Sequence, residues 1–260
     1  MKVVLFCGGL GMRLRDYSET IPKPMAEIGY RPILWHIMKY YAHFGHKDFI
    51  LCLGYRGDVI KNYFLNYNEC TSNDFVLTKG SRDPKLLNRD IDDWTISFVD
   101  TGLNSNIGQR LRAVRKHLEG EEEFMANYAD GLTDLHLPDL VRHFRERNKT
   151  AIFAAVKPKY SFHVVSIEDG DQVSGIQHLT NSGLWINGGF FVFKKEIFDY
   201  FSGDEELVEE PFQRLIAKGE LITYKHNGFW ASMDTFKDMQ QLVDLYQKGH
   251  APWQVWNSKP

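Results

Sequence analysis

Val3-Val4-Leu5-Phe6-Cys7-Gly8-Gly9-Leu10-Gly11-Met12-Arg13 is the segment that decides the fold. It begins with an apolar run of the length expected for a buried strand, and the glycines after this run predict a tight loop. Glycine lets backbone N–H groups approach an oxyanion closely, and Arg13 adds positive charge. The sequence therefore predicts a strand that delivers an anion-binding loop to one edge of a sheet.

This loop differs from two common nucleotide-binding motifs. Gly8, Gly9 and Gly11 do not fit the spacing G-x-G-x-x-G, and no Lys-Ser/Thr pair follows the last glycine as a P-loop requires. Lys23, which lies between two prolines, supplies a second cation. A nucleoside triphosphate is the expected ligand, and a tight turn that binds nothing is the alternative that these residues leave open.

The rest of the first half alternates between helical and strand patterns. Apolar residues at helical spacing follow Pro32 and end at Gly45, which predicts a helix. Strands are expected at 49–53, 94–99, 124–128 and 151–156, and further helices near 59–64 and 137–148. This alternation indicates an α/β fold with a Rossmann-like, three-layer, mixed but mainly parallel sheet. Such sheets bind ligands beyond the carboxyl ends of their strands.

The second half changes pattern. A hairpin with an acidic turn is expected over 164–176, and Gly188 and Gly189 interrupt one long strand expected over 185–193. Helices at 195–201, 205–218 and 236–248 and a strand at 221–226 complete the expected elements. Residues 66–93 are polar and weakly periodic, so we expect an excursion that forms a flap, an oligomer contact or a mobile loop.

Composition narrows the class of protein. The 260 residues carry a formal net charge of -3, so neither a nucleic-acid partner nor a membrane partner is expected. No apolar run is long enough to cross a bilayer, and no signal peptide precedes the first strand. Cys7, Cys52 and Cys70 are widely separated, which favours free thiols in a reducing compartment. We therefore expect a cytoplasmic protein.

Several short motifs occur in one order along the chain. They are Gly8-Gly9-x-Gly11-x-Arg13, Pro22-Lys23-Pro24-Met25, Asp130-Gly131, Asn187-Gly188-Gly189 and Met233-Asp234-Thr235. With them the chain resembles the sugar-nucleotidyltransferase family, and Val99-Asp100-Thr101-Gly102 and Gly228-Phe229-Trp230 are similar to its glucose-1-phosphate cytidylyltransferase branch. The resemblance implies a single nucleotidyltransferase domain over 1–260, with a nucleotide-binding part at about 1–150 and an acceptor-binding part at about 151–260.

The resemblance also implies a chemistry. It implies a Mg²⁺-dependent cytidylyltransferase that joins CTP to a phosphorylated acceptor, releases pyrophosphate and works as a homo-oligomer. Arg13 and Lys23 would be catalytic through contacts with the phosphates, and Asp130 and Asp234 would ligate Mg²⁺, which prefers one or two carboxylates together with phosphate oxygens. The implied nucleotide site further includes Gly8, Gly9, Gly11, Met12, Thr101, Gly108 and Arg110. The implied acceptor site comprises His178, Asn187, Gly188 and Trp230.

Three departures from the family pattern bear on the acceptor. Met12 replaces a threonine, Ala129 replaces a glycine, and Gln177-His178-Leu179 replaces the Glu-Lys-Pro whose lysine grips the acceptor phosphate. A titrating imidazole thus takes the place of a permanent cation. A sugar 1-phosphate such as glucose 1-phosphate is the expected acceptor. Two alternatives stay open: a non-sugar acceptor, such as phosphoglutamine or an amino-alcohol phosphate in capsule or surface-polysaccharide modification, and a nucleotide-binding regulator without catalysis.

Overall fold

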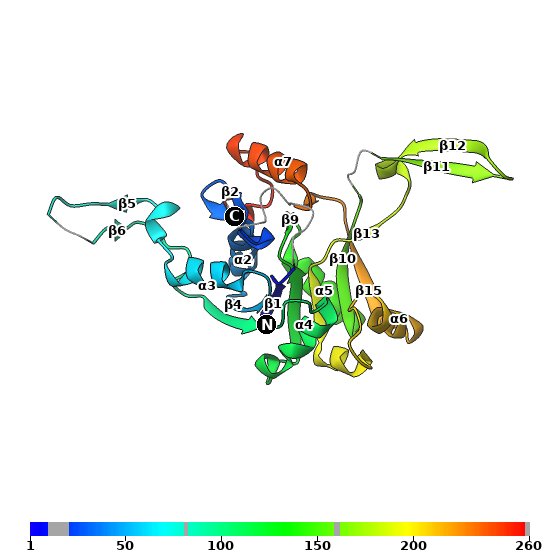
Figure 1. Cartoon of the computed structure of the whole chain (residues 1–260), viewed down its shortest axis with the longest axis horizontal. Coiled ribbons are helices and arrows are strands. Elements are labelled where there is room, and N and C mark those ends of the chain that lie inside the picture. Colours follow the sequence, from blue (N-terminus) through cyan, green and yellow to red (C-terminus); the bar gives the residue numbers. More distant parts are fainter. Residues whose placement is uncertain (10–20, 81–82, 159–161, 258–260) are drawn as a thin grey trace.

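The computed structural model describes residues 1–9, 21–80, 83–158 and 162–257, which are organised around one eight-stranded sheet (Figure 1). Strand β1 (Val3–Phe6) lies between β4 (Asp48–Leu53) and β8 (Glu123–Tyr128) and is parallel to both. Strand β7 (Thr95–Asp100) continues the parallel arrangement beyond β4. The strands expected in the first half are thus confirmed, and their carboxyl ends meet at one edge of the sheet.

The part of the sheet beyond β8 is mixed. Strand β14 (Phe191–Lys194) runs antiparallel between β8 and β10 (Ala151–Val156), whereas β15 (Leu221–His226) is parallel to β10. Strand β13 (Ile186–Asn187) also pairs with β10, so the strand expected over 185–193 is two short strands. The backbone between them has positive φ at Gly189 (74°) and Phe190 (53°), which interrupts the ladder at the expected place.

Helices cover both faces of the sheet. Val3 and Leu5 of β1 point into one buried cluster and Val4 and Phe6 into another, because side chains alternate along a strand. The first cluster includes residues of α2 (Ile33–His43), α3 (Gly57–Leu65), α5 (Leu137–Arg147) and α7 (Phe236–Gln247). The second includes residues of α4 (Ile107–Ala113), the 3-10 helix η6 (Lys195–Tyr200) and α6 (Glu210–Ala217). The expected three-layer, Rossmann-like α/β architecture is confirmed.

One helix boundary differs from the sequence prediction. The helix expected from residue 205 begins at Glu210 and carries Pro211 in its first turn. The first turn is the part of a helix that tolerates proline, because its N–H groups have no intrahelical partner. Residues before Glu210 are therefore free to form a loop beside α4. Shorter 3-10 helices lie at Lys23–Met25, Glu69–Thr71, Arg115–Leu118, Leu179–Asn181 and Val255–Asn257.

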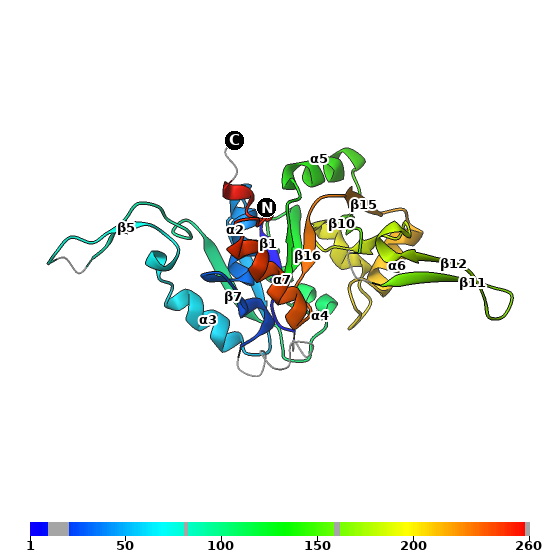
Figure 2. The ribbon, with the colours of Figure 1, turned by 90° about the horizontal axis from the view of Figure 1, so that it is seen from above.

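Two hairpins project from opposite ends of the molecule (Figures 1 and 2). Strands β5 (Phe75–Val76) and β6 (Lys85–Leu86) form one arm within the expected excursion, and β11 (His163–Glu168) and β12 (Gln172–His178) form the other. Smaller ladders join β2 (Glu27–Ile28) to β3 (Arg31–Pro32) and β9 (Gly131–Thr133) to β16 (Trp230–Ser232).

Two further expectations concern single features of the sequence. Cys7 and Cys52 are buried free thiols, as predicted, and Cys70 is also free. Within the described ranges, the structure contains no helix that is both long enough and apolar enough to span a membrane.

The imidazole of His36 joins α2 to the C-terminal segment. It is 1% exposed, its Nε2 lies 2.9 Å from the carbonyl oxygen of Ile28, and its Nδ1 accepts a hydrogen bond from Trp253 Nε1 at 3.3 Å. These contacts fit a neutral ring protonated on Nε2. Burial lowers the pKa of His36 to about 4, because the interior disfavours the charged form.

Protonation of His36 should make the fold sensitive to acid. A histidine in the unfolded chain titrates at about 6.5, so the unfolded state binds the proton more readily than the folded state between pH 6.5 and 4. The free energy of unfolding should therefore fall as the pH drops through this window, by about 3 kcal/mol for this group alone. Urea unfolding of the wild type and of His36→Gln at pH 6.5 and 4.5 checks this. The variant should lose much of the pH dependence, whereas His250→Gln, at an exposed position, should keep it.

Candidate active site

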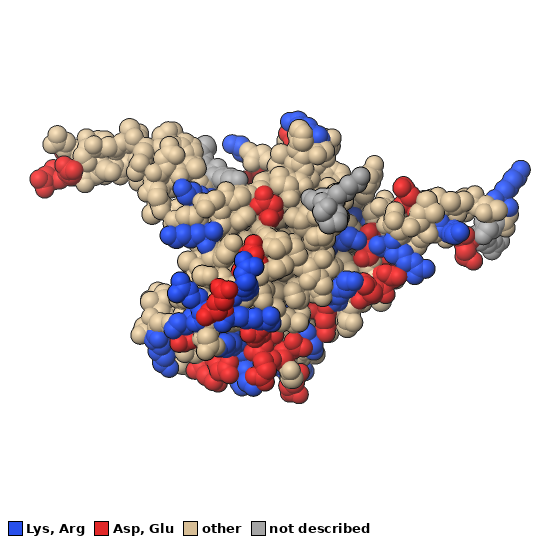
Figure 3. Space-filling view, turned by 180° about the vertical axis from the view of Figure 1, so that it is seen from behind, with Lys and Arg blue, Asp and Glu red and all other residues tan. Residues whose placement is uncertain are grey.

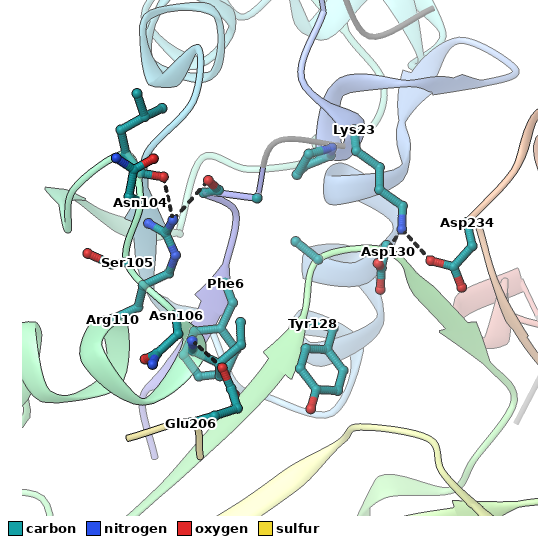
Figure 4. A pocket seen from close by; sticks show the side chains of 16 residues that line it. Phe6, Lys23, Asn104, Ser105, Asn106, Arg110, Tyr128, Asp130, Glu206 and Asp234 are labelled. Carbon is teal, nitrogen blue, oxygen red and sulfur yellow. Dashed lines mark hydrogen bonds and ion pairs between the residues drawn. The ribbon is translucent and has the colours of Figure 1, made fainter. Parts of the chain in front are cut away.

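A cavity of about 590 Å³ opens at the carboxyl edge of the sheet (Figure 4). Its wall is formed by Gly8 and Gly9 after β1, residues 103–107 after β7, Ala129 and Asp130 after β8, and Lys23 and Asp234 from more distant segments. Parallel sheets of this kind bind ligands at the carboxyl ends of their strands. The cavity therefore lies where the sequence predicted the nucleotide.

The guanidinium of Arg110 fastens three strand ends together at the base of this cavity. Arg110 is 2% exposed. Its Nη1 donates to the Leu53 carbonyl (3.1 Å), Thr101 Oγ1 (2.8 Å) and the Gly102 carbonyl (2.9 Å), and its Nη2 donates to the carbonyls of Gly8 (2.9 Å) and Leu103 (3.3 Å). Burial lowers the pKa of Arg110, since the charged form is partly desolvated. The planar guanidinium holds its N–H donors in fixed directions, so one side chain can bind all five of these oxygen atoms.

Position 8 requires a glycine because the guanidinium of Arg110 occupies the space that a side chain would need. A Cβ on Gly8 would lie 2.1 Å from Arg110 Nη1. At this distance no side chain fits at position 8 unless Arg110 moves. Thr101 serves the same cluster, since its hydroxyl also donates to the Leu53 carbonyl at 2.8 Å. The structure thus brings Gly8, Thr101 and Arg110 together. Their contacts with one another explain their identity, while contact with cytosine stays a prediction.

Gly108 faces away from the cavity. A Cβ at this position would lie 2.1 Å from the carbonyl oxygen of Glu205, so the glycine allows α4 to pack closely against the loop before α6. Its predicted contact with the base stays untested, and its observed environment is a helix-to-loop contact. Gly11, Met12 and Arg13 lie outside the described residues.

Lys23, Asp130 and Asp234 converge on the opposite side of the cavity from Arg110 (Figure 4). The Nζ atom of Lys23 lies 2.6 Å from Asp130 Oδ2 and 2.7 Å from Asp234 Oδ1. Burial alone would lower the pKa of Lys23, but the two carboxylates outweigh it and raise the pKa above its usual value. Residues that the sequence places far apart thus form one compact cluster of charges.

The cluster is held by the ladder between β9 and β16. Gly131 pairs with Ser232 in this ladder, and Met233 N donates to the Asp130 carbonyl at 2.9 Å. Asp130 and Asp234 therefore lie at the same end of the ladder. Ser232 Oγ donates to Asp234 Oδ2 at 2.8 Å, and Asp234 N donates to Asp238 Oδ2 at 3.2 Å at the start of α7. These bonds orient the Asp234 carboxylate toward the cavity.

The two carboxylates fit a magnesium ion. Their oxygens already approach one cation, the Lys23 ammonium, from two sides. No group of three or more His, Cys, Asp or Glu side chains suited to a metal occurs among the residues described. Mg²⁺ commonly uses one or two protein carboxylates and takes its other ligands from substrate phosphates and water. Asp130 and Asp234 are therefore the residues that would hold the ion.

The side of the cavity near α4 combines aromatic rings with one carboxylate, none of which the sequence analysis identified. The rings of Phe6 and Tyr128 lie 6.3 Å apart. Glu206 Oε2 accepts a hydrogen bond from Ile107 N (3.2 Å), and Glu206 Oε1 accepts one from Leu207 N (3.0 Å). Tyr128 could have been found, because it ends a strand just before Asp130. Glu206 could not, because it lies in a loop without a recognisable motif.

Three of the four predicted acceptor residues lie together beside Tyr128. Trp230 Nε1 donates to the Gly188 carbonyl at 2.8 Å. Asn187 Oδ1 accepts from Gly189 N at 2.9 Å, and Asn187 Nδ2 donates to the Tyr128 hydroxyl at 3.4 Å. These contacts place the bulge between β13 and β14 next to the cavity wall, although the three residues do not themselves line the cavity.

The fourth predicted acceptor residue, His178, belongs to the projecting hairpin. Its ring contacts that of His163 edge to face at 5.4 Å, and its Nδ1 accepts from Thr180 N at 3.2 Å. Two lysines lie nearer the sheet, where Lys157 and Lys225 approach the ring of Trp185 at 5.6 Å and 5.5 Å. Lys157 directly follows β10 at the same carboxyl edge as the cavity.

Comparison with known proteins relates this chain to nucleotide-transferring enzymes. A family pattern described as Nucleotidyl transferase matches residues 2–248. Glucose-1-phosphate cytidylyltransferase from Salmonella typhi is 39% identical over 257 residues, 98% of this chain and 100% of the relative. The probable glucose-1-phosphate cytidylyltransferase of Bacillus subtilis (strain 168) is 36% identical over 258 residues, again 98% and 100%. A solved UDP-glucose pyrophosphorylase from Acinetobacter baumannii shares the fold, with a TM-score of 0.70, 18% identity and coverage of 98% of this chain and 96% of that one.

Proposed function

Since this chain belongs to the nucleotidyl transferase family, we propose that it is a Mg²⁺-dependent cytidylyltransferase. It joins CTP to a phosphorylated acceptor, best a sugar 1-phosphate such as glucose 1-phosphate, and gives a CDP-linked product and pyrophosphate. The observation that carries this proposal is the cluster of Lys23, Asp130 and Asp234 on the wall of a cavity at the carboxyl edge of the sheet. The names of the relatives support the choice of CTP and of the acceptor.

The reaction needs positioning and charge neutralisation more than a base. A phosphate oxygen of the acceptor forms a bond to the α-phosphorus of CTP, while the bond from that phosphorus to the bridging oxygen breaks and pyrophosphate leaves. The attacking phosphate is already anionic near pH 7, so no side chain has to remove a proton. Magnesium, when bound, neutralises phosphate charge and orients the phosphates.

The residues of the site divide this work. Gly9, where a Cβ would meet nothing within 4 Å, allows the backbone to approach the phosphates, and Asp130 and Asp234 would hold the ion. Lys23, released from between the two carboxylates, neutralises charge that grows on the α-phosphate. Arg13 is proposed for the β- and γ-phosphates on the resemblance alone.

The acceptor is the less constrained part of the proposal. The division into a nucleotide part up to about residue 150 and an acceptor part beyond it places Asn187, Gly188 and Trp230 on the acceptor side. Lys157 and Lys225 beside Trp185 offer the positive charge that an acceptor phosphate needs. His178, which replaces the family's acceptor-binding lysine, lies on a projecting hairpin. For this reason phosphoglutamine or an amino-alcohol phosphate, as used in capsule modification, is kept as the second candidate acceptor.

Pyrophosphate release tests the function directly. The purified protein is mixed with Mg²⁺ and each nucleoside triphosphate against glucose 1-phosphate, phosphocholine and phosphoglutamine. Release with CTP and glucose 1-phosphate supports the proposal. Release with CTP and only a non-sugar phosphate replaces the sugar acceptor by the second candidate. CTP binding without release for any acceptor favours a nucleotide-binding regulator and contradicts the enzyme.

We also propose a homo-oligomer in which the β11–β12 arm is covered by a second copy of the chain. The register pairs Val165 with Ile176 and Ile167 with Val173, so all four side chains share one face of the hairpin, and they are 44–68% exposed. Figure 3 shows few charges along this arm and acidic residues at its tip. A two-stranded hairpin is only marginally stable on its own. No residue in the described part of the chain covers this apolar face. A second copy offers the same stripe, which suits a two-fold contact.

Charge placed on that face should prevent assembly. The double variant Val165→Glu and Ile176→Glu is expected to elute as a smaller species than the wild type in size-exclusion chromatography with light scattering. Gln177→Glu, on the opposite face of the hairpin, should assemble normally. A wild type that is monomeric at micromolar concentration would contradict the proposal.

A cytoplasmic location is proposed as well. The free thiols of Cys7, Cys52 and Cys70 support it, because such thiols persist in reducing compartments. Cell fractionation with an antibody against the protein checks this location.

A further inference from the structure

We infer that the carboxylate of Glu206 selects the nucleobase, by accepting a hydrogen bond from an amino group of the base. It would thereby favour cytosine over uracil and thymine. This inference rests on the proposed function, because it concerns the base of the same nucleotide. Glu206 lies outside every motif by which the chain resembles its relatives.

The two sides of the cavity suit different parts of a nucleotide. Lys23, Asp130 and Asp234 form the side that attracts phosphates and a metal ion (Figure 4). The other side, near α4, carries Phe6, Arg110 and Glu206, and Tyr128 lies between the two sides, so this part of the cavity offers aromatic surface and hydrogen-bonding groups. A triphosphate bound at the first side therefore places its base near the second, where flat rings can pack against aromatic side chains.

Among the described residues, Glu206 is a carboxylate without a cationic partner. Its neighbour Glu205 forms an ion pair with Arg214, whereas no Lys, Arg or His among the described residues lies within ion-pair distance of Glu206. The two N–H groups that it binds, those of Ile107 and Leu207, fix its direction but leave lone pairs on both oxygens. Burial raises the pKa of Glu206, because it leaves the charged form only partly solvated. A hydrogen-bond donor from a ligand would compensate for the solvation that the Glu206 carboxylate has lost.

Arg110 leaves the recognition of an amino group to Glu206. The terminal N–H groups of Arg110 already point at five oxygen atoms of the chain, and a guanidinium cannot accept a hydrogen bond. Cytosine carries an amino group at the ring position where uracil and thymine carry a carbonyl oxygen. A carboxylate attracts the amino group and repels the carbonyl. Glu206 is the charged acceptor on this side of the cavity.

Binding of CTP and UTP to the Glu206→Gln variant tests this role. The amide oxygen can still accept from Ile107 N, although the bond from Leu207 N to the second oxygen is lost, and the amide nitrogen can donate to the carbonyl of uracil. Isothermal titration calorimetry with Mg²⁺ and each nucleotide measures the two dissociation constants. Their ratio, UTP over CTP, should be at least about tenfold lower in the variant than in the wild type. Glu206→Ala should lose CTP affinity without gaining UTP affinity. Glu205→Gln, which alters the neighbouring ion pair outside the cavity, should keep the wild-type ratio.

The outcomes separate this inference from the proposed function. Unchanged preference for CTP in a folded Glu206→Gln variant, judged by thermal unfolding, would overturn the inference and leave the enzyme proposal intact. An equal loss for CTP and UTP would also overturn it, because Glu206 would then contact the ribose or support the loop. A wild type that binds no CTP at all would remove the proposed function, and the inference with it.

Discussion

Replacing Asp130 or Asp234 by asparagine is expected to lower the rate of pyrophosphate release by at least about 10²–10³-fold at saturating CTP. Each change removes one of the two negative charges that would hold Mg²⁺, and an amide oxygen is a weaker ligand for a hard cation. The fold should survive, because Lys23 keeps the other carboxylate as its partner. Rates measured across a range of Mg²⁺ concentrations, together with thermal unfolding, check both parts.

The control for this prediction is Asp171→Asn, in the exposed turn of the β11–β12 hairpin. It makes the same chemical change far from the cavity and should leave the rate unchanged. Near-wild-type activity of either Asp130→Asn or Asp234→Asn would remove that residue from the proposed metal site. A loss of activity that accompanies unfolding would instead assign the residue to the stability of the β9–β16 ladder.

The two aspartates illustrate what the sequence can and cannot provide. Asp130 was predictable as a site residue, because a carboxylate between a strand and a glycine lies at the ligand-binding edge of a parallel sheet. Asp234 follows a short strand that no pattern had identified as a partner of β9. Pairing between residues so far apart is a property of the whole fold, so only the family resemblance could join the two in advance.

The glycines show a different limit. Gly8 and Gly108 were both assigned to the nucleotide site on the family resemblance. In the structure, the missing Cβ of Gly8 makes room for the guanidinium of Arg110, and that of Gly108 makes room for the Glu205 carbonyl. Sequence shows that no side chain fits, but it does not show whether a ligand or the protein itself occupies the space.

The positions of the strands along the chain were predictable where local signals were strong. Apolar runs bounded by glycine, proline or charged residues gave β4, β10 and β15 within a residue of their observed ends. The division of the last long strand into β13 and β14 was signalled by Gly188 and Gly189, yet both pieces pair with the same strand β10, which depends on the register. Glu206 reaches the cavity through a loop whose path is set by packing against α4, and no local pattern encodes that path.

Arg110→Lys is expected to lower the free energy of unfolding by about 2–4 kcal/mol, even though it keeps the positive charge. The lysine ammonium has three donors and lacks the planar fork, so several of the five oxygen atoms that Arg110 binds would lose their partner in a buried place. Urea unfolding measures the change. Arg112→Lys, two residues further along α4 and on its exposed side, should change stability by no more than about 0.5 kcal/mol.

The same variant distinguishes a structural role of Arg110 from the reading of the base. If the guanidinium fastens the ends of β1, β4 and β7, Arg110→Lys loses stability without any nucleotide present, and its affinities for CTP and UTP fall together because the cavity wall shifts. If the guanidinium instead contacts cytosine alone, unfolding is unchanged and only the affinity for CTP falls. The hydrogen bonds to Gly8, Leu53 and Thr101 favour the first result, since they engage both terminal nitrogens of the guanidinium.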